Sequence, residues 1–241
     1  MNPRTLTLVD QAIGEIDRAI NVLWATPRAR RPPPEAPAGD SAAGVPAAGE
    51  PAAGVPAAGV PAGDEAGAAP LSEHARAEAA RLMRVNHAGE VAAQALYRGQ
   101  ALTARDPGTA RSMHQAAAEE MDHLAWCDER LKQLNGRSSL LNPLWYAGSF
   151  LIGSVAGILG DRASLGFIAE TERQVESHLR NHLDRLPPED RRSRAILEQM
   201  THDEIQHGVN AAALGGKDLP LWLKGAMHLT SKLMTRGSYW L

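Results

Sequence analysis

Glu119-Glu120-Met121-Asp122-His123 is a helical stretch in which a carboxylate and an imidazole stand three residues apart. Residues at that spacing share one face of an α-helix, so Glu120 and His123 can point toward the same spot. Oxygen and nitrogen ligands together suit a first-row transition metal. A single Glu-x-x-His is weak evidence, because charged helices contain the pattern by chance. Here it recurs as Glu-Ile-Gln-His at 204–207, which favours a metal site.

A lone glutamate precedes each of these motifs on an earlier helical segment. Glu90 lies 30 positions before Glu120, and Glu172 lies 32 positions before Glu204. This order over four helices is typical of ferritin-like di-iron and di-manganese carboxylate bundles. We therefore predict an all-α fold with a ferritin-like four-helix bundle, extra apolar or amphipathic helices and a disordered linker. The candidate metal ligands are Glu90, Glu120, His123, Glu172, Glu204 and His207.

Several neighbouring side chains compete for roles at this site. Glu119 lies four residues before His123, and Asp203 stands beside the second motif in the same way. The i, i+3 spacing that both motifs share favours Glu120 over Glu119. We expect His87 and His178 beside the ligands rather than among them.

On the third helix of the bundle, spacing alone does not choose between Glu170, Glu172 and Glu176. Four glutamates and two histidines carry enough charge to balance two divalent irons while leaving positions open. Zinc is disfavoured, because closed structural zinc sites prefer cysteine and tetrahedral closure. If the six groups were buried without a metal, their burial would be very costly. The alternative to a metal site is therefore that they form ordinary salt bridges at the surface.

Composition limits the function classes. The 241 residues carry a net charge of −3, so no strongly basic surface indicates a nucleic-acid partner. Cys127 is the single cysteine, which excludes an intramolecular disulfide and fits a reducing compartment. The N-terminus has no basic region followed by an apolar run, so we predict no secretory signal.

The chain divides into three segments by composition. Residues 1–25 are predicted to hold an amphipathic helix over 5–24, docked on the main domain or contacting a partner or membrane. Residues 26–70 are rich in Pro, Ala and Gly and have almost no large apolar side chains, so we predict a disordered linker. Residues 71–241 are predicted to form the ferritin-like di-iron domain.

Within this domain, apolar periodicity and turn signals predict four long helices. Ser72 is a predicted N-cap, Asp106-Pro107-Gly108 a break between helices, and Asn135-Gly136 a C-cap pair. The predicted helices span about 72–105, 109–134, 163–185 and 189–214.

Two apolar segments lie outside these helices. Residues 138–160 contain no charged side chain, and the continuous part from 144 is at the lower limit for spanning a bilayer. A buried crossover between two helical hairpins and a shallow membrane insertion both fit this segment, whereas a full span is disfavoured. Residues 219–241 are apolar with interspersed basic residues, which fits an interfacial amphipathic helix or a fifth helix covering the bundle.

Five short sequence motifs in the chain resemble motifs of the demethoxyubiquinone hydroxylases of ubiquinone biosynthesis. They are LMRVNHAGE at 82–90, EMDHL at 120–124, NPLW at 142–145, ETE at 170–172 and DEIQH at 203–207. The resemblance covers about 72–241 and, weakly, 5–24. It implies a di-iron monooxygenase that hydroxylates the ring of a demethoxylated polyprenyl quinol, with two Fe ions, O2 and an external reductant.

Carried over to this sequence, the family's ligands fall on the six candidates, which selects Glu172 over Glu176. The family histidine beyond the third-helix glutamate falls on His178. Leu179 follows it where some relatives have tyrosine, which weakens a tyrosine-mediated electron-transfer scheme. A polyprenyl quinol lies in the bilayer, so we expect 138–160 and the C-terminal helix to form a membrane-facing apolar entrance.

The expected location is therefore the cytoplasmic face of a bacterial inner membrane, with peripheral attachment. Expected partners are the membrane surface and, by family analogy, other ubiquinone-biosynthesis proteins, without nucleic acid. Homodimerisation through the apolar segments is compatible with the sequence but does not follow from it.

Three alternative functions belong to other classes of protein. A ferritin-like ferroxidase or iron-storage protein would use the same ligands, but the uncharged segment 138–160 argues against a soluble shell. A di-iron hydroxylase of a modified tRNA base would need a basic surface. A lipid-binding scaffold with a vestigial metal site ranks last, because the ligand set is complete.

Overall fold

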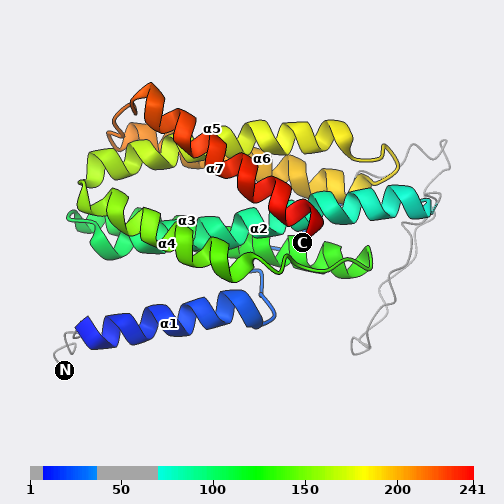
Figure 1. Cartoon of the computed structure of the whole chain (residues 1–241), viewed down its shortest axis with the longest axis horizontal. Helices are drawn as coiled ribbons and strands as arrows, with labels where there is room; N and C mark the ends of the chain where they lie inside the picture. The colour runs from blue at the N-terminus through cyan, green and yellow to red at the C-terminus, as the bar shows by residue number, and fades with distance from the viewer. Residues whose placement is uncertain (1–7, 37–69) are drawn as a thin grey trace, which may run out of the picture.

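The computed structural model describes residues 8–36 and 70–241, and in these ranges it has seven α-helices and no strand (Figure 1). The all-helical, ferritin-like prediction is confirmed. The helices are α1 (Leu8–Trp24), α2 (Glu73–Thr103), α3 (Pro107–Gln133), α4 (Asn142–Ile158), α5 (Asp161–Arg185), α6 (Arg191–Ala213) and α7 (Leu221–Trp240).

The predicted helix ends are confirmed at several positions. The side chain of Ser72 caps α2 by accepting a hydrogen bond from the backbone N–H of Ala75 at 3.2 Å. α3 begins at Pro107, two residues before the predicted start, because a proline in the first turn costs no helical hydrogen bond. It ends before Asn135, which has a left-handed backbone with φ of 55°, as predicted for the C-cap pair.

The bundle consists of α2, α3, α5 and α6, with the consecutive pairs α2–α3 and α5–α6 in extensive contact (Figure 1). All four helices contribute to one apolar cluster at one end of the bundle. Each large side chain in it gains about 1.5–3 kcal/mol by leaving water. Its members include Leu82, Met83, Trp126, Cys127, Leu179, Ile196, Leu197 and Met200.

Helix α4, from the uncharged segment, packs closely on α2. Gly153 makes this approach possible, because a Cβ there would overlap the backbone carbonyl of Leu96. The outer face of α4 stays exposed, so the buried-crossover interpretation holds for one face of the helix only. Its exposed residues include Leu144, Leu151, Ile152, Val155 and Ile158. Within the described ranges, no helix is long and apolar enough to cross a membrane.

Helix α7 runs diagonally across the bundle and contacts α2 and α5 (Figure 1). It covers part of the bundle, yet it also leaves large apolar side chains exposed. These are Leu221, Trp222, Leu229, Leu233 and Trp240. The interpretation of α7 as a helix that covers the bundle is therefore confirmed, and the interfacial interpretation stays a prediction.

Helix α1 lies alongside α2 and α4. It docks through Ala19, Val22 and Leu23, whereas Ile13 and Ile16 are exposed. The expected helix start at residue 5 lies outside the described residues.

The linker was expected to begin at residue 26, and the structure corrects this boundary. Residues 26–36 lie against the bundle, where Arg31 forms ion pairs with Asp122 and Asp203 at 2.9 Å each. These charge-assisted contacts hold Arg31 against α3 and α6. Residues 37–69, the rest of the predicted linker, lie outside the described part of the chain.

Candidate metal centre

The four bundle helices each contribute acidic or imidazole side chains to one buried cluster. Two groups of four residues have ligand atoms that all lie within 4.8 Å of one another. The first group is Glu90, Glu120, His123 and Glu204, and the second is Glu120, Glu172, Glu204 and His207. All six are buried, with exposed fractions from 0 to 7%. The six candidates from the sequence are thus brought together.

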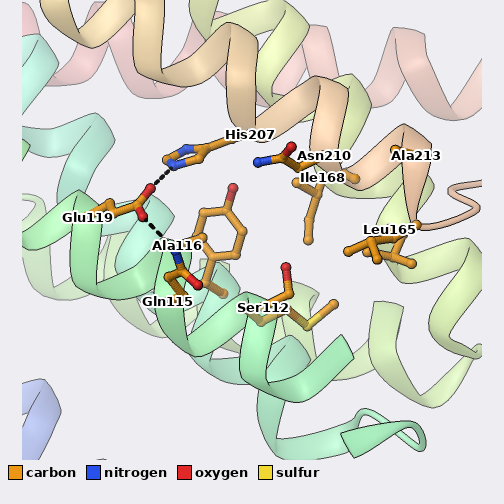
Figure 2. Close-up of a pocket in the computed structure, with 13 residues that line it drawn as sticks. Ser112, Gln115, Ala116, Glu119, Leu165, Ile168, His207, Asn210 and Ala213 are labelled. Carbon is orange, nitrogen blue, oxygen red and sulfur yellow. Dashed lines mark hydrogen bonds and ion pairs between the residues drawn. The ribbon is translucent and has the colours of Figure 1, made fainter. Parts of the chain in front are cut away.

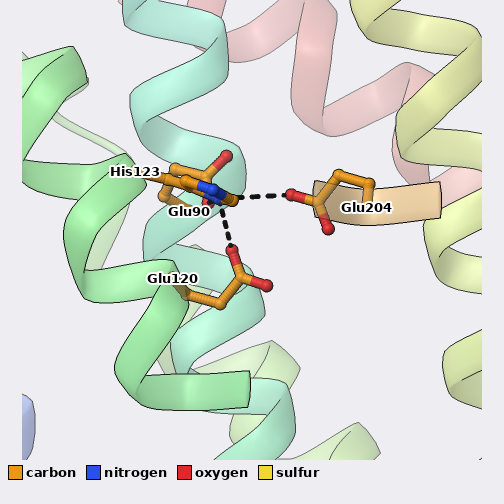
Figure 3. A group of neighbouring side chains, drawn as sticks. All are labelled: Glu90, Glu120, His123 and Glu204. Carbon is orange, nitrogen blue, oxygen red and sulfur yellow. Dashed lines mark hydrogen bonds and ion pairs between the residues drawn. The ribbon is translucent and has the colours of Figure 1, made fainter. Parts of the chain in front are cut away.

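Glu120 and Glu204 belong to both groups, and each has two carboxylate oxygens to serve them. His123 Nδ1 lies 3.2 Å from Glu120, 3.3 Å from Glu204 and 3.7 Å from Glu90 (Figure 3). His207 Nδ1 lies 3.1 Å from Glu204 and 3.2 Å from Glu120. Both imidazoles therefore turn the same nitrogen toward the shared carboxylates.

The donor set fits a pair of metal ions. Oxygen and nitrogen ligands of this kind suit first-row transition metals. Two carboxylate oxygens, Glu90 Oε2 and Glu120 Oε1, are buried without a hydrogen-bond partner in the described part of the chain. Buried carboxylate oxygens that accept no hydrogen bond are costly in a protein interior, and a bound cation would remove that cost. The cluster can therefore hold a metal.

The outward nitrogen of each histidine lies against a carboxylate from the opposite helix. His123 on α3 can donate from Nε2 to Asp203 on α6 at 3.0 Å. His207 on α6 can donate from Nε2 to Glu119 on α3 at 2.7 Å (Figure 2). Such pairs fix the orientation of a metal-binding imidazole and raise its basicity. Glu119 and Asp203 were rivals of the ligands in the sequence, and here they hold the histidines.

The pKa shifts of the two histidines follow from these contacts. Burial works against a charged imidazole, yet hydrogen bonds to Asp203 and to the site glutamates raise the pKa of His123 well above its usual range. For His207, burial is likewise outweighed by Glu120 and Glu204, which raise its pKa to about 12. Both rings therefore hold a proton firmly when no metal competes for Nδ1.

The pKa values of the glutamates diverge. Burial, followed by repulsion from Glu120, raises the pKa of Glu90 well above its usual range. Burial, followed by repulsion from Glu204, does the same for Glu172. For Glu120, burial is outweighed by the two imidazoles, which hold its pKa well below the usual range. Without a bound cation, protons on Glu90, Glu172 and the two histidines thus balance the negative charge of the cluster.

The COQ7 family model, described as ubiquinone biosynthesis protein COQ7, matches residues 77–238. The chain belongs to this family. A protein of Ralstonia pickettii named 3-demethoxyubiquinol 3-hydroxylase is 53% identical over 96% of this chain and 99% of its own length. The protein of the same name from Azoarcus sp. is 46% identical over the same shares. The one from Acinetobacter baumannii is 60% identical over 67% of this chain and 77% of its own length.

Other acids and histidines of this COQ7-family chain lie outside both groups. Glu170 pairs with Arg173 at 2.6 Å and Glu176 with Arg180 at 2.9 Å, which leaves Glu172 as the residue of its helix in the cluster. Glu170 and Glu176 thus each have an arginine partner outside the cluster.

The two additional histidines were expected beside the ligands. His87 is buried, and its Nδ1 lies 3.4 Å from the side-chain amide of Asn142. The ring of His178 lies against that of His182, with centroids 3.9 Å apart and the planes tilted by 59°. Burial lowers the pKa of both His87 and His178 to about 4, so both rings are neutral at pH 7.

The sequence interpretation did not include Tyr97. Its hydroxyl donates a hydrogen bond to Glu172 Oε1 at 2.6 Å, and its ring edge faces His207 with centroids 6.2 Å apart. Tyr97 lies seven residues after Glu90, on the same face of α2 two turns away, which is the signal that could have found it.

Two cavities reach the cluster. One of about 280 Å³, lined by polar and apolar side chains together, reaches His207 and Glu119 between α3 and α6, with Gln115 and Asn210 at its edge (Figure 2). A narrow, mainly apolar one of about 50 Å³ reaches Glu90, Glu172 and Glu204. Its outer wall is α7, through Ser231, Met234 and Thr235. The cluster thus has two approaches, a wider one of mixed polarity lined in part by α3 and a narrow, mainly apolar one lined in part by α7.

Proposed function

We propose that this chain is a di-iron monooxygenase that hydroxylates the ring of a demethoxylated polyprenyl quinol in ubiquinone biosynthesis. The observation that carries the proposal is the pair of four-residue groups sharing Glu120 and Glu204 inside the bundle. Shared carboxylates and one histidine per group are the arrangement of ferritin-like di-iron sites. The relatives named 3-demethoxyubiquinol 3-hydroxylase supply the reaction.

The six residues of the two groups would hold two Fe ions, Glu90 and His123 on one side and Glu172 and His207 on the other. The chemistry that iron supplies in such sites is activation of O2. In the overall reaction, one oxygen atom enters a ring C–H bond and the other leaves as water. Two electrons from an external reductant and two protons complete the balance.

The protein's own contribution is to orient ligands and exclude water. Asp203 and Glu119 fix the two imidazoles, and Tyr97 holds Glu172 by its hydrogen bond. The narrow apolar cavity beneath α7 supports entry of the quinol ring at Glu90 and Glu172. α7 lines this cavity and α4 does not, so we assign the entrance to α7 and a surface-binding role to α4.

The enzyme is proposed to bind a membrane surface, at the cytoplasmic face of the bacterial inner membrane. The exposed apolar side chains of α4 and α7 support this, because contiguous apolar patches mark membrane or protein interaction sites. The double variant Leu151→Glu and Ile152→Glu should release the protein from liposomes without changing its iron content. Val209→Glu adds a charge at an exposed residue of α6 and should leave liposome binding intact. Unchanged binding of the double variant would refute the surface assignment.

The activity test measures metal and product together. Purified protein loaded with iron is given reductant, O2 and a short-chain demethoxyubiquinone, and the product is weighed by mass spectrometry. We expect two irons per chain and a product heavier by one oxygen atom. Glu172→Gln should abolish both, whereas Glu176→Gln, on the same helix but paired with Arg180, should preserve both.

Other outcomes contradict the proposal in distinct ways. Two irons with O2 consumed and quinone unchanged would indicate a ferroxidase or a hydroxylase of another substrate. Protein that takes up no iron under reducing, iron-replete conditions would refute the metal centre itself.

A further inference from the structure

The segment 26–36, which we call the N-terminal arm, is anchored on α3. The backbone N–H of Arg30 donates to Asp122 Oδ1 at 2.6 Å, and Arg31 Nε donates to Asp122 Oδ2 at 2.9 Å. The indole N–H of Trp126 donates to the backbone carbonyl of Arg31 at 3.1 Å, and the guanidinium lies 5.0 Å from that ring's centroid. These contacts hold Arg31 at a defined position beside the metal centre.

Arg31 also reaches α6, where it contacts the same oxygen of Asp203 that contacts His123. Its Nη1 lies 2.9 Å from Asp203 Oδ2, the oxygen that lies 3.0 Å from His123 Nε2. The oxygen of Asp203 that contacts His123 therefore also contacts the fixed positive charge of the Arg31 guanidinium. The charge is fixed because an arginine guanidinium does not lose its proton in proteins.

Within residues 8–36 and 70–241, the second half of the centre has no such cation. Glu119, which orients His207, takes its other hydrogen bond from the neutral amide of Gln115 at 3.1 Å. Among the residues that the structure describes, no Lys or Arg forms an ion pair with Glu119. The two Glu-x-x-His motifs are thus matched in sequence and unequal in their surroundings.

We propose that Arg31 is a positioning residue that makes the two metal positions electronically different. A carboxylate bonded to a metal-binding imidazole raises the basicity of that imidazole. A guanidinium on the same oxygen draws charge away, so His123 is a weaker electron donor than His207. The iron beside His123 is then the more electron-poor of the two. This inference rests on the proposed two-iron centre.

The test is Mössbauer spectroscopy of the full-length protein loaded with 57Fe. We expect two distinct quadrupole doublets in the wild-type protein. In Arg31→Gln, one doublet should shift and the other should stay, with two irons still bound. Arg30→Gln is the matched control, because its side chain is exposed and its contact with Asp122 is through the backbone. Arg31→Lys, which keeps the charge but loses the two-armed geometry, should restore the spectrum in part.

An arm that only fastens the N-terminus would give a different result. Arg31→Gln would then melt at a lower temperature with both doublets unchanged, and this would overturn the proposal. If Arg31→Gln does not fold, Asp203→Asn provides the second variant. It should shift the same single doublet and weaken iron retention against a chelator about 10–100-fold.

The outcomes separate this inference from the proposed function. Two unequal doublets that respond to Arg31, without quinol hydroxylation, would support the inference and contradict the proposed substrate. Hydroxylation of the quinol by a centre whose two iron signals are identical would support the proposed function and contradict the inference about Arg31. A wild-type protein without iron would overturn both.

Discussion

Replacing His182 should remove a defined part of the acid sensitivity of the fold. His182 is buried on α5, and its Nδ1–H donates to Asn86 Oδ1 at 2.8 Å. Burial, followed by repulsion from His178 and Arg185, lowers the pKa of His182 to about 2. In the unfolded chain the imidazole has its ordinary pKa of about 6.5.

The sign of the effect follows from proton binding. Between these two pKa values the unfolded chain binds a proton that folded His182 does not, so the free energy of unfolding decreases as pH falls. At pH 5, which is about 1.5 units below the unfolded-state pKa, the loss is about 2 kcal/mol at about 1.36 kcal/mol per unit. Above pH 7 the contribution is constant.

The assay is urea unfolding of the metal-free protein at pH 7 and pH 5, followed by circular dichroism. His182→Asn keeps a buried donor but cannot titrate, so wild-type protein should lose about 2 kcal/mol more than the variant over this interval. His202→Asn removes an exposed histidine and serves as the control. Equal losses in wild type and His182→Asn would show that His182 does not stay neutral in the folded protein.

Three further substitutions test separate contacts. Glu119→Gln should weaken metal retention about 10–100-fold in a chelator competition without unfolding the bundle, and unchanged retention would contradict its role as a histidine partner. Gly153→Ala should lower the free energy of unfolding by about 1–3 kcal/mol in urea titrations, because its Cβ has no room. Gly148→Ala, which points into open space, should be tolerated, and equal effects at both glycines would refute the close helix contact. Tyr97→Phe should cost about 1–3 kcal/mol in thermal or urea unfolding of the metal-free protein, since Glu172 loses a buried donor. A neutral result would mean that water replaces the hydroxyl.

Local sequence signals were sufficient for the bundle and for the residues of the cluster other than Glu172, which only the family resemblance selected over Glu176. The i, i+3 spacing of Glu120 and His123 follows from helix geometry alone, and its repetition on α6 implied two halves that face each other. Helix ends at Ser72 and Asn135 followed from capping chemistry that depends on only a few neighbouring residues. These features need no knowledge of how the helices pack.

Contacts that depend on the register between helices could not be predicted in the same way. Spacing along one helix made Glu119 a rival of Glu120, yet its hydrogen bond is to a histidine on α6. The position of α3 along its axis relative to α6 decides which histidine Glu119 meets. No local sequence pattern encodes that position. Arg31 was hidden for a different reason, because its surroundings in sequence have the composition of a linker.

The crossed acid–histidine pairs link the fold and the metal centre in one structure. Asp203 reaches from α6 to His123, and Glu119 reaches from α3 to His207, so each helix fixes the imidazole of the other. The apolar core that α3 and α6 share at one end of the bundle sets their separation. A shift of either helix would therefore break both pairs at once and move both imidazoles from the shared carboxylates. Packing next to the cluster, where the centroid of the Trp126 ring lies 5.4 Å from that of His123, thereby controls its geometry. This explains why a rigid bundle suits a site that must hold six costly polar groups in place.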